Sequence, residues 1–160
     1  MLFRLLLPLF ALLLVAAAKK PPEMAVRFHL QANPQDGSSF IMPLPVHNGA
    51  GPAYIKKVPE INEQQIEAIF PFTAADGTLG CTLKLNASGR FALDALSVEE
   101  RGRVLVCFVG TRLVTAILID KRVDDGILTI PAGLAPGEVT QLEAKYRIIG
   151  QPALPKKKRR

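Results

Sequence analysis

The sequence predicts an α+β fold in which helices pack on one face of an antiparallel sheet. Strand-like apolar runs follow one another along the chain, and only a few helix-like segments separate them. About half of the 160 residues are apolar, which is enough to form a real core, and with no tryptophan that core must be mainly aliphatic. A chain of this length suits one domain, which we place at residues 26–150.

The first part of this domain is predicted to contain strands separated by turns. Residues 26–30 alternate between apolar and polar side chains, as a half-buried strand does. Residues 33–39 contain the pairs Asn-Pro and Asp-Gly and indicate a turn. Two prolines restrict residues 40–46 to an edge strand at best, and a short strand is expected at 53–58.

A short helix and two strands are expected next. Asn62 is suited to cap a helix over residues 63–69, whose isoleucines would share one face. A strand at 69–73 leads to an Asp-Gly turn at 76–77. Residues 79–85 then alternate leucine or cysteine with more polar residues, which is the clearest strand pattern up to this point.

Two longer helices are predicted, over residues 86–102 and 136–149. The apolar stripe of the first is expected to comprise Phe91, Ala92, Ala95, Leu96 and Val98. In the second, Pro136 suits the first turn and Glu138 complements the helix dipole. Its buried face is expected to carry Val139, Leu142 and Tyr146.

Between these helices lie two apolar runs, 104–109 and 113–119, joined by a short turn. Their length and β-branched content predict a hairpin at the centre of the sheet. Residues 120–126 are polar and predict a turn, after which 127–130 form a short strand.

The N-terminus resembles an export signal. Residues 1–18 contain a charged start, an apolar run and a final Ala16-Ala17-Ala18, the pattern of a signal peptide cleaved after Ala18. Lys19 and Lys20 follow directly, so a short uncleaved membrane anchor is the alternative. Residues 19–25 form a linker to the domain.

The positive charge of the chain lies at its ends. The formal net charge is +6, but without the leader, Lys19, Lys20 and the tail, 12 basic residues face 14 acidic ones. A nucleic-acid partner is therefore not expected, because such a partner needs a basic patch on the folded surface. The tail, residues 151–160, is expected to be disordered and either to aid solubility or to contact an anionic membrane surface through Lys156, Lys157, Lys158, Arg159 and Arg160.

The two cysteines, Cys81 and Cys107, have two interpretations. In an exported protein they can form one disulfide. Both also lie inside strand-like runs, where they would be two small buried side chains. Together with His29 and His47 they make no metal-ligand pattern.

The sequence shows no catalytic motif, so we expect a protein that is not an enzyme and needs no cofactor or metal. His47, in a glycine-rich loop, is the one position suited to hold a ligand, although a structural or exposed histidine is the simpler interpretation. Glu99 and Glu100 do not face each other on a helix, and Asp124-Asp125-Gly126 has too few ligands for a calcium loop.

From residue 53 to 150 the order of features resembles the periplasmic head domain of the SecD protein-export subunit. The resemblance is carried by residues 60–66, by the strand 79–85 with Asn86-Ala87-Ser88-Gly89 after it, by 102–110, and by the segments Thr115-Ala116, 126–130, Gly133-Leu134, and Glu138 with Leu142. The family usually has Asp-Gly in the hairpin turn, where this chain has Val109-Gly110. The family's multi-span membrane domain and its periplasmic base domain have no counterpart in these residues.

This resemblance implies a fold and a compartment, and it carries over no catalytic residue. The expected function is a non-catalytic interaction module of the cell envelope that contacts protein partners and assists protein export. A structural or adaptor protein with the same fold and no export role is the alternative, since fold does not fix function. The expected location is the periplasm or the outer face of the inner membrane.

Overall fold

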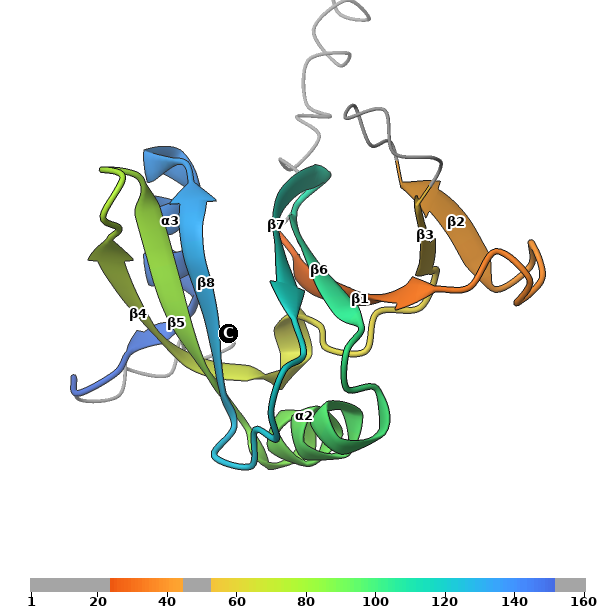
Figure 1. The fold of residues 1–160 in the computed structure, drawn as a ribbon. Helices are drawn as coiled ribbons and strands as arrows, with labels where there is room; N and C mark the ends of the chain where they lie inside the picture. Colours follow the sequence, from red (N-terminus) through yellow and green to blue (C-terminus); the bar gives the residue numbers. More distant parts are fainter. Residues whose placement is uncertain (1–23, 45–52, 152–160) are drawn as a thin grey trace, which may run out of the picture.

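The computed structural model describes residues 24–44 and 53–151, which form two β-sheets standing side by side with helix α2 below them (Figure 1). The five-stranded sheet has the order β2-β3-β1-β6-β7 and is antiparallel throughout. Its strands are β1 (Val26–Ala32), β2 (Ile41–Leu44), β3 (Ala53–Lys56), β6 (Val104–Val109) and β7 (Arg112–Leu118).

The four-stranded sheet has the order β8-β5-β4-β9. Its strands are β4 (Ile66–Thr73), β5 (Leu79–Leu85), β8 (Ile127–Leu134) and β9 (Arg147–Ile148), of which β9 runs parallel to β4. Helix α3 (Pro136–Lys145) packs on β4 and β5, whereas α2 (Ala87–Glu99) contacts β5 and the 3₁₀ turn η2 (Glu63–Gln65). The predicted α+β class is confirmed, although the single sheet that we expected is divided in two.

Both sheets contribute side chains to one hydrophobic core, so they belong to one folded unit. The core cluster contains fully buried side chains from β1, β6, β4, β5, β8 and α3, among them Phe28, Leu30, Leu105, Ile69, Leu83, Ile130 and Leu142. The expectation of a mainly aliphatic core is met, because Phe28 is the only phenylalanine among the buried core residues of the described chain.

The buried face of α2 differs from the predicted stripe. Gly89, Leu93, Leu96 and Ser97 are buried, whereas Phe91 is 77% exposed and Val98 is 55% exposed. The reason lies at the start of the helix, where the Asn86 side chain accepts a hydrogen bond from Gly89 N at 3.0 Å. A Cβ at Gly89 would lie 2.9 Å from Cβ of Gln65, so only glycine allows this close approach to η2.

The other two helices are shorter than predicted because strands take over their ends. Asn62 does cap a turn, in a capping box with Gln65, but the turn ends there and β4 begins at Ile66. The last helix begins at Pro136 as expected and ends at Lys145. Residues 147–148, predicted to be helical, instead pair with β4 as β9.

The hairpin of β6 and β7 is confirmed, but its place in the sheet was predicted wrongly. β7 forms the edge of the five-stranded sheet, not its centre, and Leu113, Ala116 and Leu118 are exposed on it. The next strand, β8, is the edge of the other sheet, so the chain leaves one sheet edge and enters another through residues 119–126.

Several predictions concern residues that the structure does not describe. The leader 1–18, the linker up to residue 23, His47 and the basic tail from residue 152 lie outside the described ranges. Within 24–44 and 53–151, no helix has the length and apolar character needed to cross a bilayer.

Candidate protein-binding cleft

An apolar cleft of about 340 Å³ lies between the end of β7 and the start of β8, next to α2. Residues 117–119 line it from one side and residues 127–129 from the other. Leu93 and Leu96 of α2 also line the cleft, together with Leu105 of β6. Figure 1 shows the two edge strands facing each other above the helix. A volume of this size falls within the range of protein ligand pockets, roughly 300–1,000 Å³.

The cleft exists because two sheet edges face each other without pairing. Across the described residues, no strand ladder joins β7 to β8. The two strands are held together at one end by Arg112, whose guanidinium donates to the Gly133 carbonyl at 2.9 Å. At the other end, residues 119–126 connect the two strands beside α2, and several of these residues line the cleft.

Arg112 also forms an ion pair with Glu138 at the start of α3. Its Nε donates to Oε1 of Glu138 at 3.0 Å, and the same carboxylate accepts from Ala135 N at 2.8 Å. Burial alone would raise the pKa of Glu138, but the hydrogen bonds from Arg112 and Ala135 outweigh it and lower that pKa. The pair therefore fixes β7 of one sheet to the β8–α3 corner of the other.

At the opposite end, α2 holds the loop of residues 119–126 in place. The buried Ser97 hydroxyl donates to the Asp94 carbonyl and accepts from Val123 N, both at 2.9 Å. Arg122 forms a bidentate ion pair with Asp94, which lowers the pKa of that carboxyl through its hydrogen bonds. Val123 lines the cleft, so these bonds shape its floor.

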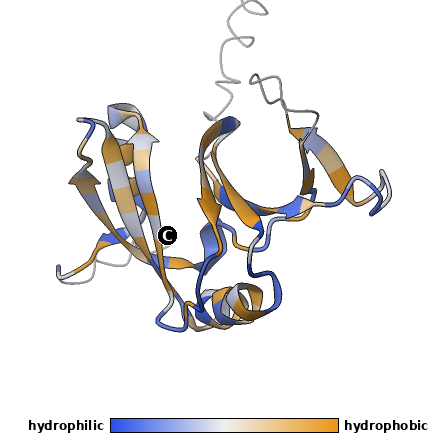
Figure 2. Cartoon of the chain, in the orientation of Figure 1, coloured by the Kyte–Doolittle hydropathy of each residue, from blue (hydrophilic) through white to orange (hydrophobic). Residues whose placement is uncertain are grey.

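The rim of the cleft combines apolar and acidic groups. Leu118 is 57% exposed at the end of β7, beside Asp120 and Lys121. In Figure 2 the apolar colouring of β7 gives way to the hydrophilic colouring of the loop that follows. Within the described chain, the carboxylates of Asp120, Asp124 and Asp125 take part in no salt bridge. Asp125 Oδ1 accepts a hydrogen bond from Ile127 N, within the polar segment that connects β7 to β8.

The two cysteines do not belong to this cleft. Both are buried free thiols, Cys81 in β5 and Cys107 in β6, and therefore lie in different sheets. Burial raises the pKa of Cys81 to about 11 and that of Cys107 to about 12. The structure therefore agrees with the second interpretation, in which the two cysteines are small buried side chains and are not joined by a disulfide.

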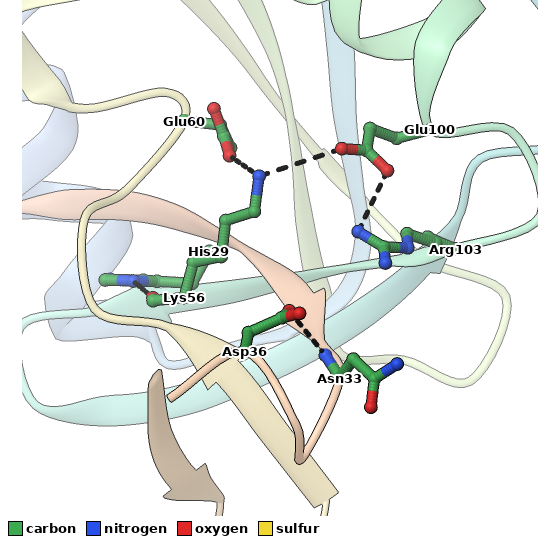
Figure 3. Close-up of polar contacts among 7 residues, drawn as sticks. All are labelled: His29, Asn33, Asp36, Lys56, Glu60, Glu100 and Arg103. Atoms are coloured by element: carbon green, nitrogen blue, oxygen red, sulfur yellow. Dashed lines mark hydrogen bonds and ion pairs between the residues drawn. The ribbon is translucent and has the colours of Figure 1, made fainter. Parts of the chain in front are cut away.

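A separate polar cluster lies at the junction of β3 and the end of α2 (Figure 3). Lys56 Nζ is 2.9 Å from Glu60 and 3.7 Å from Glu100, and Glu100 in turn pairs with Arg103 at 2.9 Å. The Nδ1 atom of the buried His29 lies at hydrogen-bond distance, 2.8 Å, from the Lys56 carbonyl oxygen. The His29 ring also makes an edge-to-face contact with the ring of Phe108. Each group thus has a structural partner, and in the described chain no three His, Cys, Asp or Glu side chains gather as metal ligands.

The sequence did not identify the cleft, although one signal was present. Residues 113–119 contain neither a charge nor a proline, which is typical of a central strand. The same pattern on an edge strand is unusual, because edges normally carry such protective residues. The edge position becomes visible only in the fold.

Comparison with known proteins identifies the fold but not a family. No family model matches the chain, and no curated protein matches its sequence. Among solved structures, the fold is similar to that of SecDF in its super-membrane-facing form, with a TM-score of 0.55 and 12% identity over 79% of this chain. This chain spans only 19% of that structure.

A second similar structure is SecDF described as a membrane component that enhances protein export. Its TM-score is 0.54 and its identity 11%, and the match covers 82% of this chain and 70% of the other. The predicted resemblance to SecD is thereby confirmed at the level of the fold. At this identity the likeness shows the fold alone, so function is argued from the site.

Proposed function

We propose that this chain is a non-catalytic interaction module of the cell envelope that binds an extended segment of another protein and assists protein export. The observation that carries this proposal is the apolar cleft between the edge strands β7 and β8, which pair with β6 and β5 but not with each other. An extended, unfolded chain offers both apolar side chains and unpaired backbone groups, and the cleft provides partners for both.

Two further observations support the export role. The similar structures are of SecDF, one of them described as enhancing protein export. The leader of residues 1–18 has the pattern that directs a protein out of the cytoplasm, and the proposed location is the periplasm or the outer face of the inner membrane. Cell fractionation tests this location, and mass spectrometry of the N-terminus distinguishes a mature chain beginning at Lys19 from an intact anchor.

The central test compares one protein probe in two states. The full chain is titrated into a fluorescently labelled, reduced and carboxymethylated protein that cannot fold, and into the native form of the same protein. We expect the unfolded form to bind at least about tenfold more tightly, a difference of roughly 1.4 kcal/mol. Equal affinity for the two forms, or no binding to either, would overturn the proposal.

Two matched variants locate the binding surface. Leu118 and Phe91 are both exposed apolar residues, but only Leu118 lines the cleft. Leu118→Ser is therefore expected to weaken binding of the unfolded probe, and Phe91→Ser is expected to leave it unchanged. If both variants lost the same affinity for the unfolded probe, the binding surface would lie outside the cleft.

Crosslinking in cells tests the biological context of this binding. A photoreactive residue at position 118 of the full chain is expected to capture exported chains or translocase subunits, and the same residue at position 91 is not. Stable capture of one folded envelope protein would instead favour the adaptor alternative with the same fold.

A further inference from the structure

We propose that β7 is a docking strand, to which an extended partner segment adds by backbone hydrogen bonds along the edge facing the cleft. This inference rests on the proposed function and specifies how the partner is held and which segments are preferred. It is carried by three observations, which concern the edge of β7, the side chains beside it and the charges at its end.

The first observation is that β7 is the least protected outer strand of the described structure. β2 contains Pro43, β8 contains Pro131, and β9 has only two residues. β7 contains no proline, and after Arg112 its residues are all uncharged. Proline, charge and short length are the usual devices that prevent pairing with another chain, so their absence marks an edge able to accept a strand.

The second observation is that the cleft accepts the side chains of an added strand. Arg112 holds the start of β7 against Gly133, so the accessible edge is the part near Ile117 and Leu118. A strand paired there would direct alternate side chains into the space floored by Leu93 and Leu96. Because this lining is aliphatic, the inserted side chains would be apolar.

The third observation is the excess of negative charge where β7 ends. Asp120 and Asp125 line the cleft, with Lys121 as the counter-charge among the lining residues, whereas Asp124 lies beside Arg90, whose Nε donates to the Asp124 carbonyl at 2.6 Å. Arg122 is already neutralised by Asp94. A lysine or arginine at the end of the docked segment would complete this arrangement. The preferred partner is therefore an extended segment of alternating apolar residues that ends in a basic residue.

Backbone methylation tests strand addition directly. In an extended strand, alternate N–H groups point to opposite sides, so only one alternate set bonds to β7. Two peptides of one alternating-apolar sequence ending in lysine are prepared, with N-methyl groups on either the odd or the even residues. We expect one set to weaken binding to the full chain at least about tenfold and the other to change it less than about twofold.

The outcomes separate this inference from the proposed function. If the unmethylated peptide and the unfolded protein bind but both methylated peptides bind equally well, strand addition is wrong and the proposed function stands. If neither the unmethylated peptide nor the unfolded protein binds, the proposed function itself fails.

A charge-neutralisation experiment tests the preference for a basic end. The double variant Asp120→Asn, Asp125→Asn is expected to bind the lysine-ended peptide several-fold more weakly and with less dependence on salt. The same peptide ending in norleucine should bind both proteins equally. Glu143→Gln removes an exposed carboxylate on α3 and serves as the control. The assignment of the acidic rim is contradicted if peptide binding loses its salt dependence in this control. It is equally contradicted if the double variant keeps the salt dependence of the unmodified protein.

Discussion

At Gly80 in β5, the four-stranded sheet leaves no room for a side chain. A Cβ atom there would lie 2.5 Å from Cζ of Phe72 and 2.7 Å from the backbone oxygen of Pro131. That oxygen moves only if β8 moves, so Gly80→Ala is expected to lower the free energy of unfolding by about 1–3 kcal/mol. Urea unfolding followed by circular dichroism measures the loss.

Gly137 provides the matched control for this substitution. It lies in the first turn of α3, and apart from its chain neighbours and the backbone of its own helix no heavy atom comes within 4 Å of a Cβ built on it. Gly137→Ala should therefore leave stability unchanged or raise it by roughly 0.4–1 kcal/mol. If Gly80→Ala were as stable as the unmodified protein, β5 and β8 would have to be more loosely packed than the structure has them.

Ser97 connects the stability of α2 to the shape of the cleft. Its buried hydroxyl accepts a hydrogen bond from Val123 N, and the Ser97→Ala variant leaves this N–H without a partner. The expected cost is about 1–3 kcal/mol in the free energy of unfolding. Hydrogen exchange should also show faster exchange at the Val123 amide.

The control is Ser88→Ala, which removes an exposed hydroxyl from the same helix. It is expected to change stability by no more than about 0.5 kcal/mol. Equal effects of the two substitutions would show that the Ser97 bond does not hold the loop. Neither Gly80 nor Ser97 was identified from the sequence, because their partners lie on strands and loops far along the chain.

Among the secondary-structure elements, the Arg112–Glu138 pair is the main charged connection between the two sheets' edges. Its carboxylate has a lowered pKa in the folded protein, so it stabilises the fold fully above the unfolded value of about 4.3. This contribution is lost as the pH falls below that value and through the lower folded pKa. Glu138→Gln is therefore expected to be less stable at pH 7, by roughly 1 kcal/mol, and to approach the unmodified protein in acid.

Glutamine is the appropriate substitution because it still accepts the hydrogen bond from Ala135 N that caps α3. Glu143→Gln on the same helix is the control and should shift neither stability nor its pH dependence. Chemical denaturation between pH 3 and pH 7 gives both quantities. If Glu138→Gln lowered the free energy of unfolding by the same amount in acid as at pH 7, the loss would come from packing and not from charge.

Elements that depend on local chemistry were predictable, and those that depend on distant partners were not. β5 has the predicted bounds, and the Asn62 and Pro136 signals mark real starts of helical turns. The predicted ends of the helices at 63–69 and 136–149 were wrong, because Ile66 pairs with Leu85 and Arg147 pairs with Ala68 in the four-stranded sheet. A strand partner elsewhere in the fold thus overrides a local helical pattern.

For the whole molecule, the same limit explains why the sequence predicted one sheet and no cleft. An apolar run such as residues 113–119 indicates a strand but not which neighbours it pairs with. The chain passes from one sheet to the other through the loop 119–126, which α2 binds through Ser97 and Asp94. The candidate site is therefore a product of tertiary topology.

The two thiols report whether the sheets unfold as one unit. Cys81 and Cys107 lie in different sheets but in the same core, and with pKa values of about 11 and 12 both are almost wholly protonated at pH 8. Neither should react with iodoacetamide in the native protein, and both should become reactive at one urea concentration, which peptide mass spectrometry resolves site by site. If Cys107 reacted at a lower urea concentration than Cys81, the five-stranded sheet would open separately from the four-stranded one. If neither reacted in urea until a reductant was added, the thiols would be joined as a disulfide.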